Sequence, residues 1–392
     1  MIYYLAQSVS AYPGRRRKAL SLNLLLTCLL LFLIDSVQAT TVKPVAQNNP
    51  NFIVELLAQD LGIPWGMTFL NPDELMFTER EGKLSILDLT TLAIRSVSGL
   101  PRVEADGQGG MLDVTTGPEY LQKGWIYFTY AKPGIDGSTT TLARARHKAD
   151  RLLDWQDLLV SDSATDTDYH FGSRIAFDSD GHVFFGIGDR GIRENAQNLK
   201  NHMGSIIRLN LDGSVPESNP FYRDVNARAE IWSYGHRNPQ GLFFDLRKQL
   251  LWSLEHGPRG GDELNLILKG RNYGWPVISH GKEYWGPVSI GEGTAKAGME
   301  QPVKFYIPSI APGSLLLYSG RAFPQWRGNL FMGALKLRHL NRIVISDDNQ
   351  ALDEERLLGE LGERIRALAQ SPEGWIYFST DSGKILRLRP AL

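Results

Sequence analysis

The pattern that decides the fold is RIAFDSDGHVFFG at residues 174–186. A short apolar run leads into an acidic turn that contains glycine, and a second run rich in aromatic and β-branched residues follows. Two such runs around a glycine-containing turn are typical of a β-hairpin. The same arrangement occurs at residues 65–78 and 365–378, so we interpret it as a repeat.

Looser copies of the hairpin begin near Gly110, Gly241 and Gly313, which brings the copies to six. Each copy then has about 57 residues, enough for a four-stranded blade and one long loop. No window has the period of a long amphipathic helix, which argues against alternating β/α architectures. We therefore predict an all-β fold, a six-bladed β-propeller with four-stranded antiparallel blades over residues 52–392, with a pair of β-sandwiches as the alternative.

The N-terminal region has the composition of a secretory signal. Residues 15–18 are RRRK, an apolar run follows, and small residues precede Thr40. This order predicts a signal peptide over residues 1–39 that is cleaved after Ala39, a linker over residues 40–51, and a periplasmic or secreted protein; an uncleaved anchor is the alternative. Cys28 is the only cysteine and lies in this signal. Cleavage would therefore exclude thiol catalysis, disulfides and cysteine-ligated zinc.

The composition of the 392-residue chain sets broad limits on its partners. Hydrophobic residues make up 42% of it, which is enough for a large core. The formal net charge of −1 gives no reason to expect nucleic acid as a partner. We expect a monomer or weak dimer without stable membrane insertion after cleavage.

A polar, glycine-dense segment at residues 256–276 stands out among the apolar runs. Its first part reads HGPRGGDELN and its end reads NYGWP. Sharp turns expose backbone carbonyl groups, and Asp262 and Glu263 add hard oxygen donors, which together form the ligand set that calcium prefers. The alternative is a long acidic turn between two strands.

One hairpin carries an imidazole near one end and a carboxylate at the other. Because a hairpin brings its ends together, His170 and Asp189 could form a pair in which the carboxylate fixes the tautomer and leaves one ring nitrogen as a base. The alternative is an unrelated histidine and turn aspartate. The run Gly186–Gly191 has the spacing of a dinucleotide-binding loop, but it ends a hairpin strand and does not open a helix, so we reject that interpretation.

Several cations and amides precede or follow predicted blade strands. Arg237 and Asn238 lie before one strand, Lys336 follows another, and Arg364 and Arg366 flank Ile365. Each cation by itself fits a solvated surface charge. If they meet at one end of the channel, they would suit a small polyanionic ligand. The stretch GQGG at residues 107–110 adds a flexible loop that carries the amide of Gln108.

These segments, in this order, resemble the soluble quinoprotein glucose and aldose sugar dehydrogenases, which bind pyrroloquinoline quinone (PQQ) and calcium on a six-bladed propeller. The resemblance covers roughly residues 52 to 390. It implies a periplasmic oxidoreductase that oxidises aldoses at C1 to lactones, and it leaves the electron acceptor and the preferred sugar open. The combination of motifs carries it: GQGG at 107–110, His170 with Arg174, GIGD at 186–189, GHRNPQG at 235–241, EHGP at 255–258 with Asp262 and Glu263, NYGWP at 272–276 and GALK at 333–336.

Carried over residue by residue, the resemblance makes His170 the general base, Asp189 the residue that holds its imidazole, and Arg237 the residue that stabilises the quinone oxygen as it gains charge. It assigns cofactor binding to Gln108, Arg237, Asn238, Lys336, Arg364 and Arg366, with Tyr284 as a further candidate. Calcium would be held through the carbonyl oxygens of Gly257 and Pro258. A second calcium would use Glu263 and the carbonyl of Tyr273.

Tyr169 departs from the family pattern, because the glucose-oxidising branch has an aspartate just before the catalytic histidine. The loops are also shorter, as in the broader aldose branch, so glucose specificity does not follow. Two other classes of function remain open: a metal-dependent propeller hydrolase such as a lactonase, and a propeller that binds without catalysis. A hydrolase needs several side chains on one channel metal, whereas a binding module has no use for the His170/Asp189 pair.

Overall fold

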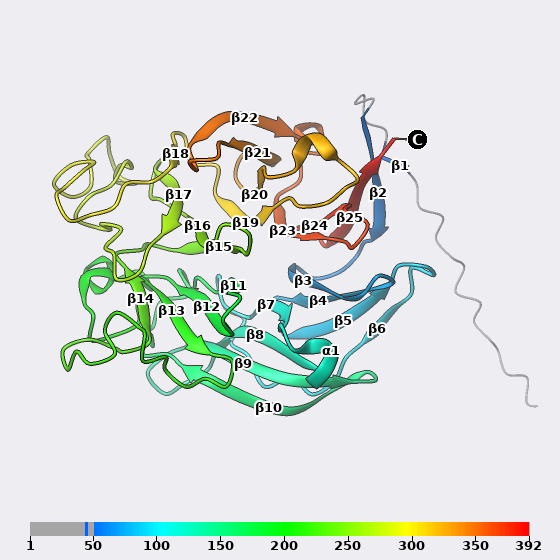
Figure 1. Ribbon diagram of the computed structural model, residues 1–392, viewed down its shortest axis with the longest axis horizontal. Coiled ribbons are helices and arrows are strands. Elements are labelled where there is room, and N and C mark those ends of the chain that lie inside the picture. The colour runs from blue at the N-terminus through cyan, green and yellow to red at the C-terminus, as the bar shows by residue number, and fades with distance from the viewer. Residues whose placement is uncertain (1–43, 46–50, 392) are drawn as a thin grey trace, which may run out of the picture. The chain divides into compact units, whose positions relative to one another are not determined.

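The computed structural model describes residues 44–45 and 51–391, and the predicted signal segment at 1–39 lies outside them. Six antiparallel sheets form the blades of a β-propeller (Figure 1). In the part of the chain described, the only α-helix is a short turn, α1 (Tyr120–Lys123). The predicted all-β propeller with six blades is therefore confirmed.

In the first three blades the strands follow chain order from the inner to the outer edge. Blade 1 has β3 (Pro64–Asn71), β4 (Glu74–Glu79), β5 (Lys83–Asp88) and β6 (Ile94–Ser96). Blade 2 has β7 (Met111–Thr116), β8 (Trp125–Lys132), β9 (Thr139–Lys148) and β10 (Arg151–Val160). Blade 3 has β11 (Ile175–Phe177), β12 (His182–Ile187), β13 (Ser205–Asn210) and β14 (Ile231–Tyr234).

The last three blades also begin with their inner strand. Blade 4 has β15 (Pro239–Asp245), β16 (Leu250–Glu255), β17 (Asp262–Ile267) and β18 (Lys304–Tyr306). Blade 5 has β19 (Pro312–Leu317), β20 (Leu330–Ala334), β21 (His339–Ile345) and β22 (Ala351–Leu357). Blade 6 has β23 (Ile365–Gln370), β24 (Ile376–Thr380), β25 (Lys384–Pro390), β2 (Phe52–Ala58) and β1 (Pro44–Val45).

Every hairpin identified in the sequence is the inner hairpin of one blade. The inner strands β3, β7, β11, β15, β19 and β23 each contact the next, and β23 contacts β3, so the ring closes. Apolar residues of neighbouring blades pack into shared clusters; one joins Phe77 of β4 to Tyr377 of β24. The beginnings of the inner strands thus gather at one end of the channel and their ends at the other.

The last blade is completed by the first long strand of the chain. Strand β2 pairs with β25 from Phe52↔Pro390 to Ala58↔Ile385, and the blue and red strands lie side by side in Figure 1. Strand β1 pairs with β2 and lies in the segment predicted as linker. This pairing joins the two ends of the described propeller, so the ring depends on it.

We expect Leu57→Ala to lower the free energy of unfolding by about 2–5 kcal/mol, the usual range for truncating a buried leucine. Leu57 lies on the closing strand, is 5% exposed and packs in the cluster between blades 6 and 1. Chemical denaturation measures the change. Leu352→Ala is the control, because that leucine is 65% exposed and its loss should cost less than about 0.5 kcal/mol. Equal effects of the two changes would contradict the closing role of β2.

Arg174, directly before β11 of blade 3, lies at the propeller axis and contacts the inner strand or its flanking residue in each of the five other blades. Its Nη1 forms a buried ion pair with Asp113 of β7 at 2.9 Å, and its guanidinium lies 4.0 Å from the ring of Trp65 on β3. It also donates hydrogen bonds to the carbonyl oxygens of Gln240 on β15, Gly313 on β19 and Arg366 on β23, at 3.2, 2.7 and 3.0 Å. One side chain therefore ties all six blades together.

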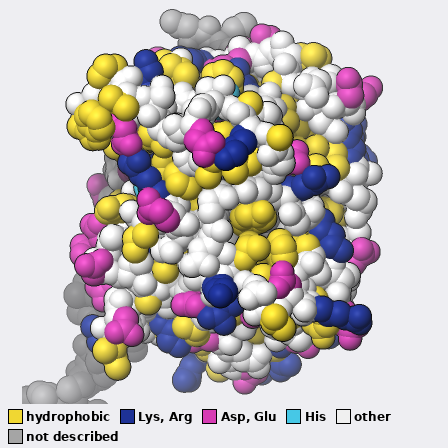
Figure 2. Space-filling view, turned by 90° about the vertical axis from the view of Figure 1, so that its left-hand side faces the viewer, with side chains coloured by type: hydrophobic (Ala, Val, Ile, Leu, Met, Phe, Trp, Pro, Cys, Tyr) yellow, Lys and Arg dark blue, Asp and Glu magenta, His cyan; other side chains and the backbone are white. Residues whose placement is uncertain are grey.

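Charged side chains of both signs are interspersed on the face of the molecule that Figure 2 shows. Neither the basic nor the acidic side chains gather into one region of this face. The mixture agrees with the formal net charge of −1. A nucleic-acid interface would need a clustered basic surface, which this face does not offer.

Candidate active site

His170 and Asp189 meet as the hairpin geometry predicts. His170 lies in the loop before β11 and Asp189 follows β12, so the antiparallel pairing of these strands brings the two residues to one end of the blade. His170 Nδ1 lies 2.6 Å from Asp189 Oδ1. The backbone of His170 has a φ of 59°, a left-handed conformation that is uncommon for residues other than glycine. This conformation costs free energy, so the surrounding contacts must hold it in place.

Asp189 is held as an ionised acceptor. Its side chain is 1% exposed, and Oδ2 accepts a hydrogen bond of 2.7 Å from the indole N–H of Trp275, while Oδ1 accepts one from the amide of Gly191. Burial acts to raise the pKa of Asp189, but the hydrogen bond from His170 and the positive charge of Arg237 act against it, and the pKa is lowered. An ionised carboxylate only accepts, so Nδ1 of His170 carries the proton and Nε2 is free.

The imidazole of His170 is kept neutral. Burial lowers its pKa most, the hydrogen bond to Asp189 opposes this, and the positive charges of Arg237 and Arg190 lower it further, so the pKa lies below the ordinary value for histidine. The ring of Tyr169 packs edge-on against it, with 4.9 Å between ring centroids. A neutral imidazole with a free Nε2 is the form that a general base requires.

Arg190 fixes the loop that carries His170, although no sequence pattern singles it out. Its side chain is fully buried and donates hydrogen bonds to backbone carbonyl oxygens of Ser138, Ser163, Thr167 and Tyr169. Its guanidinium also lies 3.6 Å from the ring of Phe171. Four carbonyl groups thus replace a carboxylate partner, and the cation holds the segment on both sides of His170.

Arg190→Gln should raise the pKa of His170, because it removes a buried positive charge that disfavours the protonated ring. A titration of the His170 ring protons by NMR measures this, with the signal assigned by its loss in His170→Gln. Arg190→Lys keeps a cation and is the control, in which the pKa should stay low. An unchanged pKa in Arg190→Gln would show that Arg190 acts on the loop alone.

Arg237 points its guanidinium at the glycine-rich loop of residues 256–262. Nη1 donates to the carbonyl oxygens of His256 at 3.1 Å and Gly257 at 2.9 Å, and the guanidinium lies 5.3 Å from the ring of Trp275. The backbone N–H of Arg237 donates to Glu255, which fixes the start of the side chain. Arg237 therefore lies between Trp275, which holds Asp189, and the carbonyl of Gly257.

The loop of residues 256–262 is organised by Asp262. The carboxylate of Asp262 accepts hydrogen bonds from the amides of Gly257 at 2.9 Å and Ala311 at 2.7 Å. A side chain at Gly257 would meet the carbonyl oxygen of Gly261 at 2.1 Å, so only glycine fits there. The carbonyl of Pro258 accepts a hydrogen bond from Ser309 at 3.2 Å. The first acidic residue of this loop is thus a structural acceptor, and the loop presents carbonyl oxygens.

The four residues predicted to hold metal all line one small cavity: Gly257, Pro258, Glu263 and Tyr273. Arg237 lines the same cavity. Glu263 lies opposite Glu255 in the register of β16 and β17, and both carboxylates accept from the amide of Asn265. Burial and the charge of Glu255 raise the pKa of Glu263. A cation there would relieve this repulsion, and the donors are the hard oxygens that calcium prefers, so the residues fit such an ion.

A second cavity, of about 250 Å³, collects three of the predicted cofactor residues: Gln108, Arg364 and Arg366. Gln108 also accepts a hydrogen bond of 3.0 Å from the backbone N–H of His170, which joins this cavity to the base. The side-chain nitrogen of Asn238, a residue that is 0% exposed, has no hydrogen-bond partner among the described residues. Its side-chain oxygen accepts hydrogen bonds from the backbone N–H of Gly172 and the side-chain amide of Gln240, which both line the cavity. A carbonyl-bearing anionic cofactor would satisfy such an orphaned donor and would suit the two arginines.

Asp381, to which no sequence motif pointed, changes the charge of this cavity. Arg364 and Arg366 both pair with it, at 2.7 and 2.8 Å, so one of the two positive charges is already neutralised. The sequence feature that could have identified Asp381 is its position directly after β24, since loops at that end of the inner hairpin reach the channel. Lys336 is exposed and directly follows Leu335 of the cavity wall, and Tyr284 is 65% exposed and is not part of the wall.

Residues 61–387 match the glucose/sorbosone dehydrogenase family. The chain is 38% identical over 346 residues to the aldose sugar dehydrogenase YliI of Escherichia coli, and the alignment covers 86% of this chain and 92% of that protein. The apo structure of the E. coli aldose sugar dehydrogenase superposes with a TM-score of 0.83 at 36% identity, over 86% of this chain and 99% of the other. A PQQ-bound aldose sugar dehydrogenase from Streptomyces coelicolor gives 0.73 at 25% identity, over 90% and 98%.

The propeller and these likenesses define the protein as an oxidoreductase. The chain belongs to the glucose/sorbosone dehydrogenase family.

Proposed function

We propose that the protein is a quinoprotein that oxidises aldose sugars at C1 to lactones, with PQQ and calcium as cofactors. The observation that carries this proposal is the hydrogen bond between a neutral His170 and Asp189. Gln108, which accepts a hydrogen bond from the backbone of His170, connects this pair to the cavity of Arg364 and Arg366. The PQQ-bound relative from S. coelicolor supports the choice of cofactor.

His170 takes the proton of the C1 hydroxyl at Nε2. Asp189 holds the Nδ1 proton and stabilises the imidazolium that forms, while Trp275 keeps Asp189 in place. PQQ would supply the acceptor for the hydride that leaves C1, and calcium would polarise its quinone carbonyl. Arg237 lies where its guanidinium can stabilise an oxygen that gains negative charge beside Gly257.

The remaining assignments rest on the two cavities for the residues that line them, and on the family resemblance for Asn238, Lys336 and Tyr284. Gln108, Asn238, Arg364 and Arg366 hold the cofactor, with Lys336 and Tyr284 as contributors from the rim. Gly257 and Pro258 bind the calcium next to the cofactor through their carbonyl oxygens, and Glu263 with the Tyr273 carbonyl binds the second. The protein is exported by its signal at residues 1–39, acts on small aldoses in the periplasm, and passes electrons to a separate acceptor as a monomer or weak dimer.

A propeller hydrolase fits the site less well. Within residues 44–45 and 51–391 no group of three His, Cys, Asp or Glu side chains is placed to hold one metal ion. The predicted metal residues offer mainly backbone carbonyl groups. A binding propeller, in turn, gives no role to the pairing of His170 with Asp189 or to the left-handed backbone of His170. In the described residues no helix is long and apolar enough to cross a bilayer.

The test is reconstitution of the purified protein with PQQ and calcium, followed by reduction of a dye by a panel of aldoses. We expect quinone absorbance to stay with the protein after dialysis and at least one aldose to reduce the dye. EDTA treatment followed by loading with PQQ alone, without calcium, should prevent both. Loss of all quinone on dialysis together with no dye reduction would refute the proposal.

A further inference from the structure

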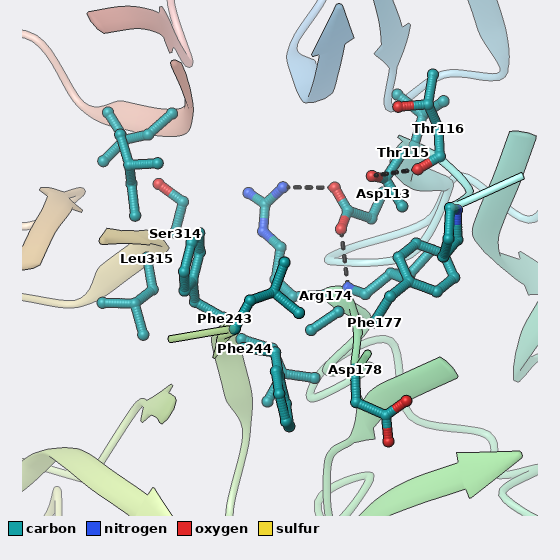
Figure 3. Close-up of a pocket in the computed structure, with 18 of the residues that line it drawn as sticks. Asp113, Thr115, Thr116, Arg174, Phe177, Asp178, Phe243, Phe244, Ser314 and Leu315 are labelled. Atoms are coloured by element: carbon teal, nitrogen blue, oxygen red, sulfur yellow. Dashed lines mark hydrogen bonds and ion pairs between the residues drawn. The ribbon is translucent and has the colours of Figure 1, made fainter. Parts of the chain in front are cut away.

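A larger cavity, of about 610 Å³, lies around the propeller axis at the end opposite to the catalytic pair (Figure 3). The cavity that contains Gln108, Arg364 and Arg366, which we call the cofactor cavity, is lined by the beginnings of the inner strands and the loops before them. The ends of the same strands line the larger cavity. Arg174 lines its inner end and contacts Trp65 and Gln240, which line the cofactor cavity. The Arg174–Asp113 pair therefore separates the two cavities. We call the larger one the rear cavity.

The walls of the rear cavity are mostly apolar. Figure 3 shows Phe177 of β11, Phe243 and Phe244 of β15, and Leu315 of β19 around it. Leu246, 58% exposed, lies at its mouth. Apolar and aromatic walls with a few polar groups, in a space of several hundred Å³, are typical of sites for small molecules.

The charged side chains that line the rear cavity are paired among the described residues. Both oxygens of Asp113 are occupied, one by Arg174 at 2.9 Å and the other by the amide of Ile175 at 2.9 Å. Asp178, which also lines it, pairs with His182 at 2.8 Å. A charged ligand would therefore lose its hydration without a counter-ion, which is unfavourable.

Hydroxyl groups are the other polar feature of the rear cavity. Ser314 is 3% exposed, and its hydroxyl has no hydrogen-bond partner among the described residues. Thr115 makes only a weak contact of 3.5 Å with the carbonyl of Thr116. A buried hydroxyl without a partner costs free energy, and a ligand with one carbonyl or hydroxyl group would satisfy it. A sugar, with a hydroxyl on almost every carbon, would leave most of its groups unpaired against these walls.

We propose that the rear cavity is a second binding site, which takes an uncharged, largely apolar ring compound that carries one carbonyl or hydroxyl group. The compound packs against the phenylalanine and leucine side chains and hydrogen-bonds to Ser314. The site does not depend on the proposed catalytic function, because the Arg174–Asp113 pair separates it from the cofactor cavity.

Nile red, an uncharged ring dye with one carbonyl group, tests this site without any sugar or cofactor. We expect its fluorescence to rise and saturate with one dye per protein. Thr115→Trp fills the cavity and should weaken binding at least tenfold, whereas Thr115→Val, of similar size, should keep it. Leu246→Asp, at the exposed mouth, should also weaken binding and does not burden the core.

Three outcomes would overturn the proposal. The first is an absence of saturable binding. The second is equal binding by the wild type, Thr115→Trp and Leu246→Asp, which would place the dye elsewhere on the surface. The third concerns the ligand class: the anionic dye 1-anilinonaphthalene-8-sulfonate should bind at least tenfold more weakly than Nile red, and equal affinity would contradict an uncharged ligand. Glucose at high concentration should not displace Nile red.

Discussion

Replacing His170 with alanine should lower aldose turnover by about two to four orders of magnitude, the range expected for loss of a general base. The Nδ1 atom of the imidazole is 2.6 Å from Asp189, the pKa of the ring is lowered and its free nitrogen is Nε2, so the substitution removes the proposed proton acceptor. Binding of PQQ should persist, because the residues proposed to hold the cofactor belong to other blades. Steady-state dye reduction and quinone absorbance after dialysis measure the two effects separately.

The control is His182→Ala. His182 pairs with Asp178 at 2.8 Å, which is the same kind of contact at the opposite end of strand β12. It lines neither the cavity of Arg364 and Arg366 nor that of Gly257 and Glu263, so turnover should stay within about twofold of the wild type. Equal losses in His170→Ala and His182→Ala, or unchanged turnover in His170→Ala, would remove His170 from the mechanism.

The largest effect on stability is expected from Arg174→Ala, which should lower the free energy of unfolding by about 3–5 kcal/mol. The change leaves Asp113 as a buried carboxylate without its partner and removes hydrogen bonds to three other blades. Chemical denaturation measures the loss.

A double variant separates the charge effect from packing. Arg174→Met with Asp113→Leu removes both charges and keeps apolar volume at the axis, so it should recover part of the lost stability. A change below about 1 kcal/mol in Arg174→Ala would show that the contacts around Arg174 are not what joins the blades.

The blades were predictable because each inner hairpin is local in sequence, with its turn residues between two apolar strands. The closure of the ring was not predictable, because β2 and β25 are far apart in the sequence and no local pattern links Phe52 to Pro390. The role of Arg174 at the axis was hidden for the same reason: its partners come from five other blades.

The candidate site shows the same division. His170 and Asp189 could be paired from the sequence because they flank one hairpin, and the glycine-rich loop was visible from its composition. Arg190, Trp275 and Asp381 received no role, because each acts through contacts with distant segments. Asp381 also changes the charge balance: the arginines next to Ile365 were expected to face a ligand as free cations, yet they share one carboxylate.

The sharpest experiment on the proposed mechanism is a single turnover of the PQQ- and calcium-loaded protein with an aldose labelled with deuterium at C1. We predict that the quinone is reduced, that the lactone is released, and that deuterium at C1 slows reduction whereas deuterium at C2 does not. Failure of every aldose to reduce the quinone in the loaded protein would contradict this mechanism.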